Sequence, residues 1–401
     1  MKKTVNYNGK LLSLKLLNAV FVLVVFGIFY MPNVAGRDYL GIFILFSSVF
    51  IIILYGKFFI NRQAILILVF ITYTIFVDFA SNFVYPTSIA FLLRTIVYAS
   101  VPIIAFLLGS FFSNWINEKL VNKAILIIGF IQALVGIAQV YNKTFRELIL
   151  KYFTNYEKYS YTFEIWGTGR AVGTIGNPNT FGVFMVIFVL FALTLLFFRR
   201  GNGKLYNLIL IITILISVYA IILSQSRTAF ILLIMSTIIL VFFSRKRIIL
   251  RLSILFTLLI IFMIIYHHDP FLSKRFGAEN VSTLGGRIHV WKAIIENYLS
   301  PFTAYNLIGY GFYYVRDIGN AIDNFYLQLI LQYGLIGLVL YINMFIYSIK
   351  AFLRRINVSE YGKFIVLTII VILISDFTGA ISMSVDIFTF YFLILGYYFK
   401  K

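Results

Sequence analysis

Long apolar runs alternate with short basic or turn-forming stretches along nearly the whole chain. Such runs can cross a hydrocarbon core of about 30 Å as α-helices, which takes roughly 20 residues. The pattern therefore predicts an all-α polytopic integral membrane protein with about twelve transmembrane helices. They are expected at about 16–31, 39–55, 64–80, 88–109, 122–141, 177–198, 205–224, 228–243, 248–266, 323–348, 364–380 and 385–399.

Polar positions concentrate in two long segments between these runs. Loops of this length in compact proteins are usually functional or disordered, and the Trp, Tyr and Gly content here is not typical of disorder. We therefore expect the functional site where the spans meet these two loops. The resulting organisation is 1–141 (five spans), 142–176 (first long outer loop), 177–266 (four spans), 267–322 (large outer loop) and 323–401 (three spans).

Composition and charge refine this picture. The chain is 61% hydrophobic and 12% charged, and it contains no Cys and only three His, so thiol chemistry and Cys- or His-ligated metals have few candidates. Most of the net charge of +20 falls on the segments that a cytoplasmic N-terminus would place inside, as the positive-inside rule predicts. The charge therefore indicates an inner-membrane protein with both termini cytoplasmic, and it does not favour nucleic acid as a partner.

The end of the first long loop, residues 169–179, contains one arginine among three glycines and finishes with an Asn-Pro-Asn sequence. Asn177 before Pro178 predicts the N-cap of the next helix. Amides at a helix start attract anions, and Arg170 could hold a phosphate together with Asn177 and Asn179. A purely structural role for the segment remains the alternative.

Two further arginines stand at the borders of spans. Arg227 separates two apolar runs with almost no loop, where it either extends toward lipid headgroups or faces a cavity and holds a phosphate. Arg287 and Trp291 would share one helix face because they are four residues apart. Trp291 either anchors the chain at the membrane interface or, together with Tyr310, stacks on sugars.

The tenth expected span opens with Asp323, Asn324 and Tyr326. Asp323 either orients or deprotonates an acceptor hydroxyl or caps the helix. Within the spans, charged side chains are costly and are typically paired or functional. Asp78 and Arg94 lie near the outer ends of two consecutive expected spans, which predicts an ion pair between them.

Several common site motifs are absent from the sequence. A Gly-rich loop ending in Lys-Ser/Thr does not occur, which disfavours an ATP-driven pump. No Asp-x-Asp occurs either, so a metal-held nucleotide sugar has no candidate ligands. We therefore expect neither a metal nor an organic cofactor.

Taken in order, the motifs between about 165 and 345 resemble the O-antigen ligase and polymerase-like membrane proteins, which join oligosaccharides carried on undecaprenyl pyrophosphate. The ligases resemble one another in a motif of His-Asn, nine residues, Gly, two residues and Gly. Here Asn324, Gly334 and Gly337 keep that spacing, but Asp323 stands at the His position. The resemblance thus implies the polymerase branch: a glycosyltransferase that builds surface polysaccharide, O-antigen or capsule, from lipid-linked repeat units on the outer face of the cytoplasmic membrane.

On this interpretation, positioned arginines stabilise the pyrophosphate leaving group. The expected partners are the undecaprenyl-pyrophosphate-linked donor and acceptor, membrane lipid, a chain-length regulator and a flippase. A ligase is the first alternative function, and a lipid-linked oligosaccharide flippase is the second, although no internal repeat supports it. The expected catalytic residues are Arg287, Asp323 and Arg227, and the expected substrate-binding residues are Arg170, Asn177, Asn179, Trp291, Tyr310, Asn324 and Tyr326.

Overall fold

The computed structural model describes residues 14–31, 33–34, 37–38, 43–44, 46–48, 60–84, 86, 88–153, 169–198, 203–243, 256, 260, 287–300, 302–312, 315, 322–354, 360–379, 382 and 384–400. This part of the chain is almost entirely helical, with one pair of two-residue antiparallel strands, β1 (Asn33–Val34) and β2 (Arg37–Asp38). The helices are α1 (Leu14–Tyr30), α3 (Arg62–Val84), α4 (Ile89–Phe112), α5 (Glu118–Tyr141), α6 (Lys143–Phe153), α9 (Pro178–Phe198), α10 (Lys204–Ser224), α11 (Arg227–Phe242), α15 (Arg287–Ile294) with a π-helical continuation (Ile295–Leu299), α16 (Ala304–Ile308), α18 (Phe325–Leu353), α19 (Glu360–Ser375) and α20 (Val385–Lys400).

The membrane-spanning character predicted from the sequence is supported by helix length and composition. Six described helices, α3, α4, α5, α9, α10 and α18, are long and apolar enough to cross a membrane. Four shorter apolar helices, α1, α11, α19 and α20, coincide with further expected spans. The expected spans at 39–55 and 248–266 lie mostly outside the described residues, so the count of twelve stays a prediction.

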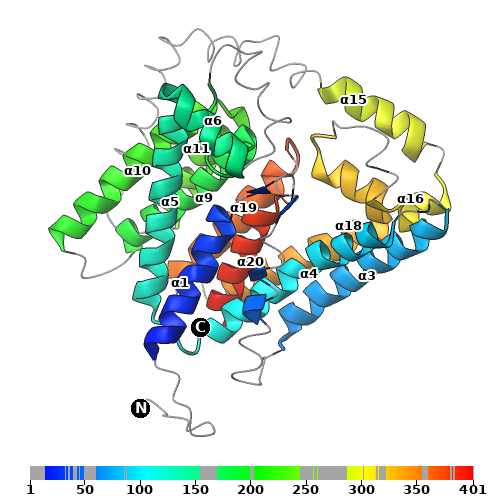
Figure 1. Cartoon of the computed structure of the whole chain (residues 1–401), viewed down its shortest axis with the longest axis horizontal. Helices are drawn as coiled ribbons and strands as arrows, with labels where there is room; N and C mark the ends of the chain where they lie inside the picture. Colours follow the sequence, from blue (N-terminus) through cyan, green and yellow to red (C-terminus); the bar gives the residue numbers. More distant parts are fainter. Residues whose placement is uncertain are drawn as a thin grey trace, which may run out of the picture.

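The helices form one bundle with α1, α19 and α20 at its centre, α5, α9, α10 and α11 on one side, and α3, α4 and α18 on the other (Figure 1). Nearly every residue of α9 is buried, as expected for a helix that is apolar on all its faces. Helix α20 lies directly against α4, because Gly109 and Gly396 allow the two backbones to meet. A Cβ at either glycine would come within 2.0 Å of a carbonyl oxygen of the other helix, which is the close small-residue packing typical of membrane helices.

One end of the bundle carries basic residues from several helices. Tyr361 at the start of α19 donates to Glu118 Oε1 at the start of α5 (2.7 Å), and Lys363 Nζ lies 4.0 Å from the ring centre of Phe198 at the end of α9. The starts of α5 and α19 and the end of α9 therefore lie at the same end of the bundle. The sequence also predicts these three helix ends on one side of the membrane. Whether this end faces the cytoplasm stays a prediction.

Both long loops contain ordered helix where they are described. In the first, α6 follows α5 directly, and Arg146 of α6 donates from Nε to Gln139 O (2.8 Å) and from Nη2 to Val140 O (3.1 Å), carbonyls at the end of α5. The large loop contains α15, its π-helical continuation and α16. Residues 154–168 and 267–286 of these loops lie outside the described part of the chain.

Helix α18 is broken inside the membrane-facing region, where the sequence predicted one continuous span. Gly334 has φ 65° and ψ −174°, and a Cβ there would lie 2.2 Å from Leu307 O, so this position requires glycine. At the break three backbone carbonyls accept hydrogen bonds from groups outside the helix. Leu331 O accepts from Tyr310 N, Gln332 O accepts from Gly311 N, and Tyr333 O accepts from Tyr73 Oη. Residues 307–311 therefore pack against α18 at the break, ten residues after its N-cap, Asn324.

Candidate functional site

The N-termini of α9, α11 and α18 and the C-terminus of α19 meet at the end of the bundle opposite its basic end. The Oγ1 atoms of Thr228, in α11, and Thr378, just after α19, are 2.6 Å apart. Phe325 N at the start of α18 donates to Asp376 O after α19 (2.8 Å). Helix α15 lies along this edge of the molecule, at the upper right of Figure 1. The structure therefore brings together motifs that are far apart in the sequence.

The segment before α9 is fixed by its own polar side chains. Arg170 is 6% exposed and donates from Nε to Ser224 O and from Nη2 to Asn179 Oδ1, both at 2.9 Å. Asn177 Oδ1 accepts from the amides of Asn179 (2.8 Å) and Thr180 (3.2 Å), which confirms the predicted N-cap. These contacts favour a positioning role for the segment, because its polar groups bind the α10–α11 turn and the start of α9.

Two glutamines of α5 hold the same segment, and the sequence analysis did not identify them. Gln139 Oε1 accepts from Gly173 N (2.9 Å), where the backbone has φ 59°. Gln132 Oε1 accepts from Thr174 N (3.2 Å), and its Nε2 donates to Thr174 Oγ1 (2.5 Å). Both glutamines are fully buried. Their spacing of seven residues in an apolar helix was the available signal, since it places two amides on one face.

Arg227 is the first residue of α11. Gln225 ends α10 in the left-handed conformation (φ 51°), and Ser226 then caps α11 with its Oγ accepting from Ala229 N (3.3 Å). Arg227 follows this short turn. Partial burial lowers the pKa of its guanidinium, and the positive charge of Arg287 in α15 lowers this pKa further. Two positive charges that act on each other make the local electrostatic potential more positive, which favours an anion. Whether Arg227 extends to lipid headgroups or faces a cavity stays a prediction.

Arg287 also forms a salt bridge with Asp323, with Nε 3.0 Å from Oδ2. The Arg287 side chain is 21% exposed and that of Asp323 is 56% exposed. The predicted alternative that Asp323 caps the tenth span is wrong, since α18 begins two residues later and Asn324 caps it, with Oδ1 accepting from Leu327 N (3.1 Å). Asp323 therefore stands just outside the helix and is paired with Arg287.

An aromatic wall borders this cluster of Arg227, Arg287 and Asp323. Trp291, one turn after Arg287 in α15 as predicted, meets Phe377 edge-on with ring centres 6.5 Å apart. Tyr326 contacts the same Phe377 ring at 5.6 Å and donates its hydroxyl to Leu373 O. Phe377 is 57% exposed, and the sequence analysis missed it because it lies in the turn after α19.

Tyr310 is packed into a small hydrophobic core below α15. Its ring stacks on Tyr305 with centres 4.9 Å apart, and it packs against the buried side chains of Ile294 and Leu331. Its backbone amide binds Leu331 O. These contacts favour a structural role for Tyr310.

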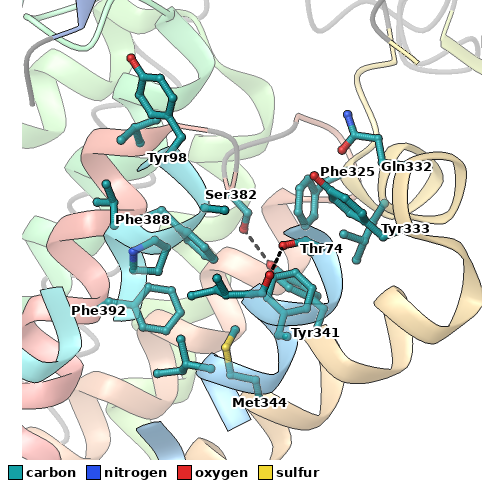
Figure 2. Close-up of a pocket in the computed structure, with 18 of the residues that line it drawn as sticks. Thr74, Tyr98, Phe325, Gln332, Tyr333, Tyr341, Met344, Ser382, Phe388 and Phe392 are labelled. Atoms are coloured by element: carbon teal, nitrogen blue, oxygen red, sulfur yellow. Dashed lines mark hydrogen bonds between the residues drawn. The ribbon is translucent and has the colours of Figure 1, made fainter. Parts of the chain in front are cut away.

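A cavity of about 170 Å³ lies between α3, α4, α18 and α20. Its lining is mostly apolar, with Phe325 at one end, two residues beyond Asp323. Figure 2 shows the hydroxyls of Tyr341 and Ser382 meeting in its wall (2.7 Å). Both hydroxyls also bind the fully buried carboxylate of Asp376, each at 2.7 Å. The lining of the cavity thus includes the first residue of α18, and one of its walls carries hydrogen-bonded polar groups.

The carboxylate of Asp78 accepts hydrogen bonds from the large loop and from α18. Its Oδ1 accepts from Phe312 N (2.8 Å), and its Oδ2 accepts from the Tyr333 hydroxyl (3.3 Å). Asp78 is 2% exposed. The side chain of Arg94 lies outside the described residues, so the expected Asp78–Arg94 ion pair stays a prediction.

Residues 212–342 match the family model described as O-antigen ligase. The matched range contains Arg227, Arg287, Trp291 and Asp323, whereas the Arg170 segment precedes it. The resemblance drawn from the motifs is confirmed over this range, and the match supports a membrane enzyme of the O-antigen ligase or polymerase type. A comparison with curated proteins finds no match.

Proposed function

We propose that this protein is a glycosyltransferase of the repeat-unit polymerase kind. It transfers a growing glycan from undecaprenyl pyrophosphate onto the sugar of the next lipid-linked unit, at the outer face of the cytoplasmic membrane. The observation that carries the proposal is the salt bridge that joins Arg287 in α15 to the exposed carboxylate of Asp323 before α18. The charge of Arg287 also acts on Arg227 at the start of α11. The family match over residues 212–342 supports the class of enzyme.

The two arginines stabilise the leaving group. As the bond between the donor sugar's anomeric carbon and the pyrophosphate oxygen breaks, its electron pair moves to the pyrophosphate, whose negative charge increases. Positioned guanidinium groups bind phosphate oxygens with paired, charge-assisted hydrogen bonds. Since Asp323 occupies Nε of Arg287, the terminal nitrogens of Arg287 are the ones that bind the phosphate.

Asp323 serves the acceptor. While the acceptor hydroxyl oxygen bonds to the anomeric carbon, its proton passes to the Asp323 carboxylate, which the salt bridge holds close to the leaving group. The faces of Trp291, Phe377 and Tyr326 border this point. Aromatic rings with polar rims suit sugars, whose faces are apolar and whose edges carry hydroxyls.

The cavity beside the start of α18 suits part of the lipid carrier. Its volume of about 170 Å³ is comparable to the roughly 150 Å³ of an apolar cavity that holds one benzene ring. A short branched piece of an isoprenoid chain fits such a space, and the remaining chain lies in the bilayer. Phe325 and Leu329 would contact this piece while the pyrophosphate lies at the arginines.

The proposal is tested in a deletion strain complemented with variants, by separating the surface glycan on a gel. We expect single repeats without polymer from the deletion and from Arg227→Lys or Arg287→Lys. Lys292→Arg is the matched control, because Lys292 is also in α15 but is exposed and paired with Glu296 on the surface. Lipid-linked polymer that is not passed on would instead identify a ligase, and repeats retained in the cytoplasm would identify a flippase.

A further inference from the structure

A second groove lies between α5 and α10, at the basic end of the bundle. Its volume is about 770 Å³, several times that of a cavity for one benzene ring, which is roughly 150 Å³. Lys119 and Lys123 stand at one end of the groove, together with Gly203 at the start of α10. This groove is far along both helices from the arginine cluster, so it does not belong to the proposed glycosyl-transfer site.

The walls of the groove are apolar. On α5, Ile127 and Phe130 continue the same helix face as the two lysines, at a spacing of three and four residues. On α10, the opposite wall contains Ile209 and Ile212. Ile127, Ile209 and Ile212 are each exposed by 40% or more in the isolated chain. In a membrane-spanning region such side chains are covered by hydrocarbon.

The charged end of the groove is open and positive. Lys119 and Lys123 are exposed, while the neighbouring Glu118 accepts a hydrogen bond from Tyr361 of α19 (2.7 Å) and is thereby directed to a different helix. A Cβ added at Gly203 would meet no atom of the described residues within 4 Å. The lysine end therefore has both positive charge and room for a headgroup.

We propose that this groove binds an anionic glycerophospholipid. Lys119 and Lys123 hold the phosphate of the headgroup, and the acyl chains lie along the isoleucines of α5 and α10. Charge complementarity selects an anionic lipid over a zwitterionic one, and the length of apolar wall beyond the lysines selects a lipid over a soluble phosphate. The lipid fills the space between α5 and α10, and α5 also carries the glutamines that hold the Arg170 segment.

The test uses the purified full-length protein in nanodiscs or detergent, with dioleoyl phosphatidylglycerol and dioleoyl phosphatidylcholine as probes and bound lipid counted by native mass spectrometry. Each lysine near an anionic lipid contributes about fivefold in affinity. The double variant Lys119→Gln/Lys123→Gln is therefore expected to bind phosphatidylglycerol about 30-fold more weakly. Lys350→Gln/Arg354→Gln is the matched control, since it removes two exposed cations from the end of α18, outside the groove.

A second variant, Ile212→Trp, narrows the groove but keeps both lysines. We expect it to reduce phosphatidylglycerol binding as well, while the control pair binds like the wild type. Equal binding of the two lipids by the wild type would overturn the proposal. An equal loss in the control pair would show general surface attraction, and displacement of the lipid by millimolar inorganic phosphate would show an anion site without a lipid requirement; either result also overturns it.

Discussion

The salt bridge between Arg287 and Asp323 allows the proposed chemistry to be separated from a structural role. Its atoms are 3.0 Å apart, and the side chains are 21% and 56% exposed. A pair that is this exposed contributes only about 0.2–1 kcal/mol to stability. If the two residues only held each other, Arg287→Lys and Asp323→Asn would each cost no more than this, and the double variant would cost about as much as either one.

The proposed mechanism predicts much larger effects on the rate. Arg287→Lys keeps the charge but loses the planar fork, which should cost about 2–4 kcal/mol of transition-state stabilisation, or roughly 30- to 1,000-fold. Asp323→Asn keeps an oxygen that accepts from Arg287 Nε but cannot take a proton. General-base catalysis typically contributes about 10²- to 10⁴-fold. Both losses exceed what the salt bridge alone can explain.

The assay measures initial rates of glycan transfer in proteoliposomes that contain purified protein and lipid-linked repeat units, with thermal unfolding followed in parallel. Lys292→Arg should keep the wild-type rate and melting behaviour. If Arg287→Lys retains more than a third of the wild-type rate at equal protein, Arg287 does not bind the leaving group. If Asp323→Asn does so, Asp323 is not the base, and small non-additive losses in both would identify a surface ion pair.

Three other predictions concern topology and stability. Because the chain contains no Cys, single cysteines at 202 and 300 can report sidedness: a membrane-impermeant reagent should label only 300 in intact cells, and labelling of 300 only after permeabilisation contradicts the orientation. Gly334→Ala should lower stability by about 2 kcal/mol or more, because it adds left-handed strain and a contact with the α16 backbone. Gly379→Ala is the control in thermal unfolding, since a Cβ there meets no described residue within 4 Å. Asp376→Ala should cost about 2–5 kcal/mol, since it leaves buried hydroxyls without their acceptor, and an unfolding midpoint equal to the wild type would remove Asp376 from the structural core.

Local sequence signals predicted local structure well. The Asn177 cap is set by neighbours within three residues, and the shared helix face of Arg287 and Trp291 is set by their spacing of four residues. The apolar runs also predicted where the described membrane helices occur. These features depend on hydrogen bonds and periodicities inside one segment, so no tertiary information is needed to find them.

Other features depend on contacts between distant segments and were not predictable from one sequence. Asp323 and Asn324 are both good capping residues, and the sequence alone does not decide between them. In the structure Asn324 caps α18, and the next amide, that of Phe325, binds Asp376 O. The position of Phe377 also depends on a contact between distant segments. The hydroxyls of Thr228 and Thr378 meet, and this contact places the turn after α19, which contains Phe377, beside the start of α11.

The polar residues of the motifs divide into two groups according to what their side chains already bind. Arg170, Asn177, Asn179 and Asn324 direct polar atoms to backbone or neighbouring side chains, and they fix the ends of α9, α10 and α18. Arg227 follows the end of α10 that Arg170 binds, and Asp323 lies directly before the start of α18 that Asn324 caps. Arg287, the first residue of α15, is paired with Asp323. A transition state gains most from groups that need no rearrangement when charge develops, so rigid helix ends are the appropriate support for the arginines. The first group therefore acts through the positions of the second, which accounts for two kinds of polar residue within one set of motifs.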